Sequence, residues 1–208
     1  MIADIDSTAG AALATSLGDR CGFRQIDVTS ADDWAALLSD IHAQFGDFSC
    51  LVNNAGINTV GSVVSTTEAD WSRTMAVNAT GIFLGFRAAV GAMGATGGII
   101  VNTASALGQR ASSGQIAYCA SKAAVLSLTR SVALHCGENG TAIRRNAVCP
   151  GIVNTPILDE TRALLGGGGA AERDAADRKA GPALRGGVHG RLSCLAGGGV
   201  HHRRSDQC

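Results

Sequence analysis

Tyr118 and Lys122 have the residue types and the spacing for acid–base chemistry. Tyr118 is the only tyrosine in this chain of 208 residues, and Lys122 is the only lysine before Lys179. Residues four apart lie on the same face of a helix. A phenol ionises near pH 10 on its own, and an adjacent ammonium favours its ionised form. The pair could therefore exchange a proton with an alcohol oxygen near neutral pH, although the same spacing also arises by chance on a solvated helix face.

Ser105 and Asn78 are two further polar residues in informative positions. Ser105 follows the apolar run 98–102, which has the length and β-branched composition of a buried strand. Ligands of open α/β sheets bind at the carboxyl ends of the strands, which is where this hydroxyl would lie. Asn78 lies inside the helical stretch 68–93. Taken singly, Ser105 could be a strand-end cap and Asn78 a helix kink.

The elements that must position these residues alternate along the chain. Helices are expected at 7–17, 30–45, 68–93 and 114–136, with strands at 23–27, 48–52, 98–103 and 142–148. Ser30 and Asp33 have the spacing of a capping box at the start of the second helix. Alternation of this kind predicts right-handed βαβ units, and hence a doubly wound parallel sheet with helices on both faces.

Four motifs in this order closely resemble the short-chain dehydrogenase/reductase family. They are Asn53-Asn54-Ala55-Gly56 with Asn78 downstream, Ser105, Tyr118-Cys119-Ala120-Ser121-Lys122, and Pro150-Gly151-Ile152-Val153-Asn154-Thr155. The resemblance covers about residues 1–160 and implies a Rossmann-like fold that binds NAD(P). It also implies an oxidoreductase that transfers a hydride between this cofactor and an alcohol or ketone.

The resemblance implies a role for each catalytic candidate. Tyr118 would be the general acid or base at the substrate oxygen. Lys122 would lower the pKa of Tyr118 and bind the nicotinamide ribose. Ser105 would hydrogen-bond the substrate oxygen, and Asn78 would anchor a water that relays protons from Lys122.

Further residues would bind the cofactor. Asp4 closes the first apolar stretch, where a carboxylate would accept from the adenosine ribose and repel a 2′-phosphate, so NAD is expected rather than NADP. Asp27 would lie beside the adenine, or would be only part of a strand exit. The other candidates are Asn54, Ala55 and Gly56 on the adenosine side, and Pro150, Gly151 and Thr155 near the nicotinamide.

Both ends of the chain depart from the family pattern. The first strand, glycine-rich turn and helix of the family have no counterpart before Asp4, so residues 1–165 are expected to form an incomplete Rossmann-type domain. Residues 166–208 are rich in Gly, Ala and Arg without any aromatic residue. We expect this tail to be disordered and to lack the last strand, and its composition is that of a GC-rich gene read out of frame. Arg145 in a central strand is a further anomaly, since an unpaired arginine there would be destabilising.

These departures leave three interpretations. The first is an NAD-linked dehydrogenase, the second an NADPH-dependent 3-oxoacyl-type reductase, and the third a catalytically silent fragment of such an enzyme. Asp4 counts against the second, and the absence of a glycine-rich turn favours the third.

Composition narrows the possible partners. The formal net charge is zero, which argues against nucleic acid, and no apolar run long enough to span a membrane is apparent. The seven cysteines have no C-x-x-C pair and no metal-ligand spacing, so reduced thiols in a cytoplasmic protein without a metal are expected. The expected partners are a small alcohol or ketone and, for an intact family member, further copies of the chain in a homo-oligomer.

Overall fold

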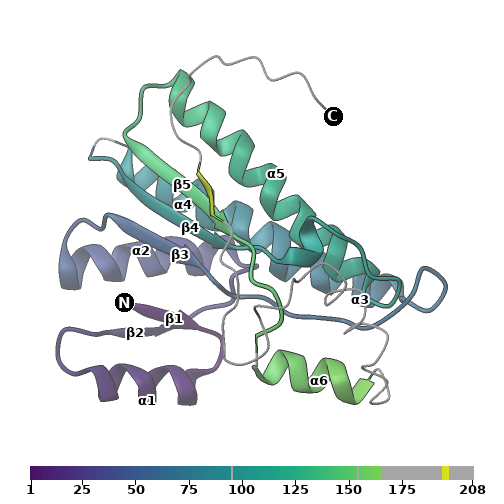
Figure 1. The fold of residues 1–208 in the computed structure, drawn as a ribbon. Coiled ribbons are helices and arrows are strands. Elements are labelled where there is room, and N and C mark those ends of the chain that lie inside the picture. Colours follow the sequence, from purple (N-terminus) through teal and green to yellow (C-terminus); the bar gives the residue numbers. More distant parts are fainter. Residues whose placement is uncertain (95, 154, 165–193, 197–208) are drawn as a thin grey trace, which may run out of the picture.

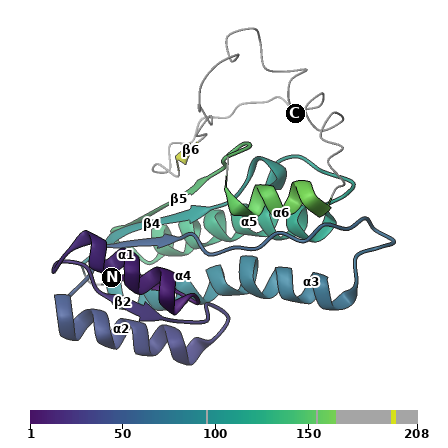
Figure 2. The same cartoon turned by 90° about the horizontal axis from the view of Figure 1, so that it is seen from below.

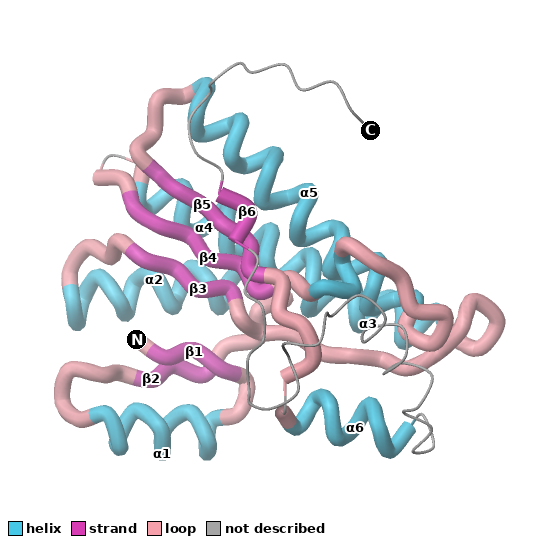
Figure 3. Tube along the Cα trace, in the orientation of Figure 1, coloured by secondary structure: helices cyan, strands magenta, loops and turns pink. Residues whose placement is uncertain are grey.

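The chain folds as an α/β protein with parallel sheets, as the alternating pattern predicts (Figures 1 and 3). The structure is a computed structural model and describes residues 1–94, 96–153, 155–164 and 194–196. The strands are β1 (Ile2–Asp4), β2 (Phe23–Gln25), β3 (Cys50–Asn53), β4 (Gly98–Thr103), β5 (Ile143–Val148) and β6 (Cys194–Ala196). The helices are α1 (Ser7–Leu17), α2 (Ala31–Phe45), α3 (Glu68–Met75), α4 (Gly81–Met93), α5 (Ile116–Glu138) and α6 (Pro156–Leu164).

The strands form two sheets. In the smaller sheet β1 pairs in parallel with β2, with Asp4 opposite Gln25. In the larger sheet the order is β3-β4-β5-β6, with β3, β4 and β5 parallel. Helices α2, α4 and α5 lie on one side of the two sheets. Helix α1 lies on the other side, against β1 and β2 (Figure 2).

Strand β6 differs from the expectation for the tail. Residues 194–196 pair antiparallel with the end of β5, from Asn146 to Val148. Residues 194–196 are thus a short strand within the tail, while the expected absence of the family's last strand stays a prediction. Residues 165–193 and 197–208 lie outside the described part of the chain, so the rest of the expectation for the tail stays a prediction.

The neighbouring edges of the two sheets are unpaired in the described residues. β1 lies next to β3 (Figures 1 and 3), but β1 pairs only with β2 and β3 only with β4. As a result Val52 of β3 is 57% exposed and Cys50 is also exposed. Strands of a parallel sheet are ordinarily buried on both faces, so an apolar side chain this exposed is consistent with β3 being an open edge.

Local capping explains where α2 begins, with one correction to the sequence analysis. The Ser30 hydroxyl accepts a hydrogen bond from the Asp33 backbone N–H at 3.1 Å, as the capping box requires. The Asp33 carboxylate, however, accepts from the Asp27 backbone N–H at 2.7 Å rather than from that of Ser30. Asp33 therefore connects the helix to the end of the preceding strand.

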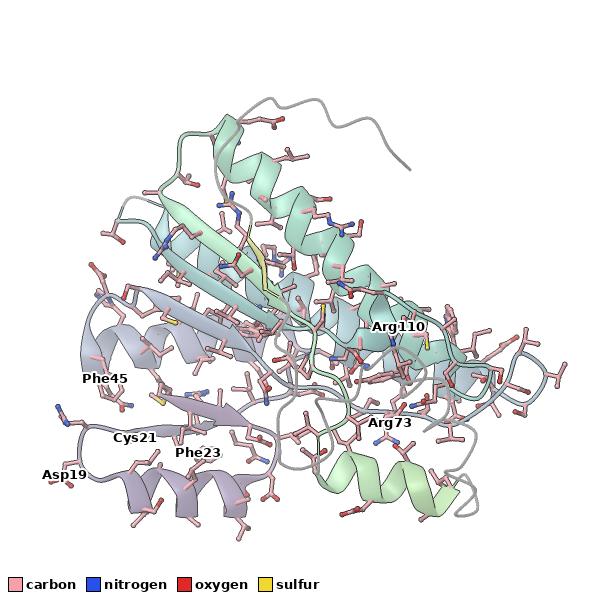
Figure 4. All side chains as sticks on the ribbon, viewed as in Figure 1. Asp19, Cys21, Phe23, Phe45, Arg73 and Arg110 are labelled. Atoms are coloured by element: carbon pink, nitrogen blue, oxygen red, sulfur yellow. The ribbon has the colours of Figure 1, made fainter. Side chains whose placement is uncertain are left out.

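Helix α4 is shared by two apolar cores. Its residues Ile82, Phe86, Ala89 and Met93 pack in the larger core with Ile100 and Val125, while Leu84 packs with Ile26, Trp34 and Leu37 in the smaller one. Phe23 of β2 fills the space between the small sheet and α1 (Figure 4). The Arg145 guanidinium donates to the Ala133 carbonyl at 2.6 Å, so the unpaired arginine considered above does not occur.

The helical segment Glu68–Met93 corrects another expectation. By length and composition it could cross a membrane, although the sequence analysis expected no such run. In the protein 44% of its most apolar window is buried, and the residues named above pack in the two cores. A core helix passes the same test, so one such segment is weak support for a membrane span.

Candidate active site

Ser105 and Tyr118 meet at the carboxyl end of β4. Ser105 comes two residues after β4, and its hydroxyl accepts from the Leu107 backbone N–H at 3.1 Å. This hydrogen bond caps the single 3-10 turn η2 (Ala106–Gly108). Tyr118 lies in the first turn of α5, and the side chains of Ser105 and Tyr118 are hydrogen-bonded to each other. The two hydroxyls are thus close enough to bind one substrate oxygen, which is the geometry the motif spacing predicts.

Lys122 lies one helical turn further along α5. Its side chain is buried, and its ammonium donates to the Thr103 carbonyl at 2.8 Å. The same nitrogen lies 5.7 Å from the centre of the Tyr118 ring. An ammonium has three N–H donors, so Lys122 can bind the strand end and still donate to a ligand.

Burial controls the protonation of both groups. Burial raises the pKa of Tyr118 above its ordinary value, while the Ser105 hydrogen bond lowers it in part and the Cys119 thiol raises it. Burial also lowers the pKa of Lys122 from 10.5 to about 8. The expected lowering of the Tyr118 pKa is not met in this structure, because desolvation of the phenolate by burial is the largest effect on it.

Asn78 connects three segments of the site. The residues 76–80 around it form a π-helical segment, η1 (Ala76–Thr80), between α3 and α4. The Asn78 side chain accepts from the Ile57 backbone N–H at 2.8 Å and donates to the Ile57 carbonyl at 2.8 Å. It also donates to the Ser121 hydroxyl at 2.9 Å. Asn78 therefore marks a break in helical geometry, as the helix-kink reading expects, while its role in a proton relay from Lys122 stays a prediction.

The Asn54-Ala55-Gly56 segment passes directly beside Lys122. A Cβ atom at Gly56 would lie 3.2 Å from the Lys122 nitrogen and 3.3 Å from the Asn78 Oδ1 atom. Asn54 accepts from the Thr103 hydroxyl at 3.0 Å, while Ala55 is exposed. The loop after β3 is thereby fixed to the end of β4.

The remaining cofactor candidates also follow strand ends, but most are exposed. Pro150 follows β5 and accepts from the Ala106 backbone N–H at 2.9 Å, whereas Gly151 is exposed. Asp4 ends β1, and its carboxylate accepts from the Asp6 backbone N–H at 2.9 Å. These contacts place Pro150 against the Ser105 turn, and Asp4 at the end of the small sheet.

Asp27 and Thr155 make only local contacts. One Asp27 oxygen accepts from the backbone and the hydroxyl of Thr29, at 2.8 and 2.7 Å. The Thr155 hydroxyl donates to the Val153 carbonyl at 3.5 Å and lies just before α6. Asp27 thus acts as the strand-exit turn considered above, which leaves its contact with adenine a prediction.

Sequence reasoning missed three residues of the site. Thr103 supplies the carbonyl that holds Lys122, Ser121 holds Asn78, and Gly108 lies against the Lys122 backbone. The glycine three residues after Ser105 was a usable signal, because a turn that must approach a helix backbone favours glycine. The contacts of Thr103 and Ser121 had no local signal.

Comparison with known proteins agrees with the fold and identifies the family. Residues 1–165 match the family described as short chain dehydrogenase. The 3-beta-hydroxysteroid dehydrogenase of Comamonas testosteroni is 39% identical over 155 residues, which are 74% of this chain and 61% of that protein. The 3-alpha-(or 20-beta)-hydroxysteroid dehydrogenase of Mycobacterium tuberculosis (strain ATCC 25618 / H37Rv) is 40% identical over 157 residues, which are 75% of this chain and 60% of that protein.

A solved structure agrees as well. The crystal structure of a short chain dehydrogenase from Mycobacterium smegmatis superposes with a TM-score of 0.68 at 36% identity, covering 73% of this chain and 64% of that one. The chain therefore belongs to the short-chain dehydrogenase family. It spans about three fifths of the length of the curated relatives cited here.

Proposed function

We propose that the protein is an oxidoreductase that transfers a hydride between NAD(H) and a secondary alcohol or its ketone. The hydrogen bond between Ser105 and Tyr118, with the Lys122 ammonium beside it, carries this proposal. Two hydroxyls and an ammonium at a strand end suit a substrate whose oxygen gains or loses a proton while its carbon exchanges a hydride. Relatives named as hydroxysteroid dehydrogenases support a hydroxyl-bearing substrate.

In the direction of alcohol oxidation, the ionised Tyr118 oxygen takes the hydroxyl proton as the C–O bond becomes a carbonyl. Ser105 donates to the same substrate oxygen and holds it against Tyr118. The Lys122 ammonium lies beside the phenol ring, and Asn78 holds the loop that carries Gly56 beside Lys122. A nicotinamide cofactor bound beside these residues would supply the hydride acceptor for the substrate carbon.

The residues fit the nicotinamide end of such a cofactor. The Lys122 ammonium and the Tyr118 hydroxyl have the donors that bind ribose hydroxyls, and Pro150 lies against the turn that carries Ser105. At the other end Asp4 has a carboxylate for the adenosine ribose. The described residues contain no glycine-rich turn between a strand and a helix N-terminus for the pyrophosphate.

The test of this function is oxidation of secondary alcohols, hydroxysteroids among them, followed as formation of NADH. It is run on the 208-residue chain and on a form with a strand–turn–helix unit of the family fused before Met1. Tyr118→Phe is expected to lower kcat by at least about a hundredfold, because general acid–base catalysis contributes about 10²–10⁴. Equal turnover by Tyr118→Phe and the unchanged protein would rule out the mechanism.

Asp4 carries the proposed preference for NAD over NADP. In the fused form, Asp4→Ser should raise kcat/KM with NADPH, because the 2′-phosphate no longer meets a carboxylate. The ratio of kcat/KM with NADH to kcat/KM with NADPH should therefore fall. Asp19→Ser, a change outside the site, is the matched control. If the unchanged enzyme uses NADPH as readily as NADH, then the role of Asp4 is wrong and the 3-oxoacyl-type reductase becomes the better reading.

A second candidate, a catalytically silent protein, is favoured by the unpaired edges of β1 and β3. On that reading the 208-residue chain has the catalytic side chains but binds the cofactor too weakly for turnover. Losing several backbone hydrogen bonds of a pyrophosphate site, at about 1 kcal/mol each, weakens binding by about a thousandfold. We therefore expect little or no turnover by the 208-residue chain, and ready turnover by it would remove this candidate.

A further inference from the structure

The η2 turn packs directly on the backbone of α5 at Lys122. A Cβ atom at Gly108 would lie 2.7 Å from both the carbonyl carbon and the carbonyl oxygen of Lys122, and 3.1 Å from the Ala123 nitrogen. Real Cβ atoms do not approach other heavy atoms this closely. The clashing atoms belong to the backbone of a helix, so no side-chain rotation can relieve the overlap. The turn and the helix can keep this separation only while residue 108 is glycine.

The same turn carries Ser105. The Gly108 N–H donates to the Ser105 carbonyl at 3.0 Å, while the Ser105 hydroxyl accepts from the Leu107 N–H at 3.1 Å. At its start the turn is held by the Ala106 N–H, which donates to the Pro150 carbonyl. A displacement of Gly108 away from α5 therefore moves Ser105 as well, because only two residues of tightly bonded turn separate them.

We propose that Gly108 is a positioning residue that sets the distance between the Ser105 hydroxyl and the Tyr118 phenol. Gly108 itself touches neither a substrate nor the reacting atoms. It lets the η2 turn pack against the backbone of Lys122 in α5, close to the side chains of Ser105 and Tyr118. The importance of this distance for turnover rests on the proposed function, whereas the positioning role does not.

The single tyrosine makes the test specific. Phenolate absorbance of the 208-residue chain reports the ionisation of Tyr118 and of no other residue. Gly108→Ala is expected to raise the Tyr118 pKa by about one, because the hydrogen bond from Ser105 stabilises the phenolate and is lost or lengthened. Among the described residues, the titratable groups that face Tyr118 are the Cys119 thiol and the Lys122 ammonium.

The matched control is Gly137→Ala in α5, the helix that carries Tyr118. A Cβ atom at Gly137 would meet nothing within 4 Å, so the Tyr118 pKa should not change. Ser105→Ala should raise the pKa as Gly108→Ala does. The double variant should show no further rise, because Gly108 acts through Ser105.

Three results would overturn the proposal. They are an unchanged or lowered Tyr118 pKa in Gly108→Ala, additive effects in the double variant, and loss of the folded circular dichroism spectrum in Gly108→Ala alone. The last would make Gly108 a residue on which the whole fold depends, rather than a positioning residue. The titration uses neither cofactor nor substrate, so a protein without dehydrogenase activity could still confirm it.

Discussion

At the scale of single residues, burial decides the charge of the two groups that would handle protons. Lys122 is 3% exposed and Asn78 is fully buried, so the ammonium is solvated mainly by the Thr103 carbonyl. Its lowered pKa brings its titration close to the physiological range, where a small change of environment alters its charge. Lys122 can therefore give up a proton more readily than a surface lysine.

The lowered pKa of Lys122 predicts how stability depends on pH. Between about pH 8 and 10.5 the unfolded chain holds a proton on Lys122 that the folded chain has released, so the Lys122 contribution to stability rises with pH. Below pH 8 the cost of burying the ammonium is fully present. The free energy of unfolding of the protein minus that of Lys122→Met should therefore increase from pH 7.5 to 9.5, as measured by urea denaturation. A difference that stays flat over this range would show that the pKa of Lys122 is not lowered.

The proximity of Ser105, Tyr118 and Lys122 was predictable because their spacing along the chain is informative. Tyr118 and Lys122 share a helix face, and Ser105 follows a strand that periodicity identifies. The net effect on the Tyr118 pKa was not predictable, since desolvation depends on atoms from several distant segments. The contact between Asn78 and Ser121 joins residues 43 apart, for which no local pattern exists.

At the scale of elements, one buried side chain joins η1, the loop after β3 and α5. Asn78 uses its oxygen and its nitrogen for hydrogen bonds to Ile57 and Ser121. The π-helical segment leaves Asn78 fully buried at this junction, between two ordinary α-helices. The sequence predicted one continuous helix over 68–93, because apolar periodicity does not detect one extra residue in a turn.

Removing the Asn78 side chain should therefore loosen three elements together. Asn78→Ala leaves the partly buried N–H and carbonyl of Ile57 without these partners, and should lower the free energy of unfolding by about 2–4 kcal/mol. Ser121→Ala removes one hydrogen bond and should cost about 1 kcal/mol. Asn139→Ala, at the exposed end of α5, is the control and should cost less than about 1 kcal/mol. Equal losses for Asn78→Ala and Asn139→Ala in urea denaturation would contradict this role.

At the scale of the whole molecule, the two sheets have neighbouring strand edges that are open. The described residues give β1 a partner only in β2, and β3 a partner only in β4. The alternation of elements predicted the order of strands and helices, while the short antiparallel β6 was not predictable from a segment without apolar periodicity. The exposure of Val52 follows from the pairing and could not be predicted from an apolar run alone.

A parallel strand supplied between β1 and β3 should stabilise the protein. A strand–turn–helix unit of the family fused before Met1 would cover the Val52 side chain and pair both edges. We expect a rise in Tm of about 5–10 °C, since 1 kcal/mol corresponds to about 2–4 °C for a chain of this size. The control carries two prolines in the supplied strand, which prevent pairing. Equal Tm values for the two fusions would mean that the added strand does not pair with β1 and β3.

Because α4 packs in both apolar cores, the two parts of the protein are expected to unfold in a defined order. Trp34 lies in the smaller core and donates through its indole nitrogen to the Val28 carbonyl, so its fluorescence reports that core. No strand ladder crosses from one sheet to the other in the described residues, and Leu51 and α4 are the apolar links. The smaller sheet with α1 and α2 should therefore melt before the larger one, and its backbone amides should exchange with solvent faster than those of β4. In a Trp71→Phe variant, which leaves Trp34 as the single tryptophan, the fluorescence change on denaturation should precede the loss of helical signal, because the protein would unfold as two cooperative units.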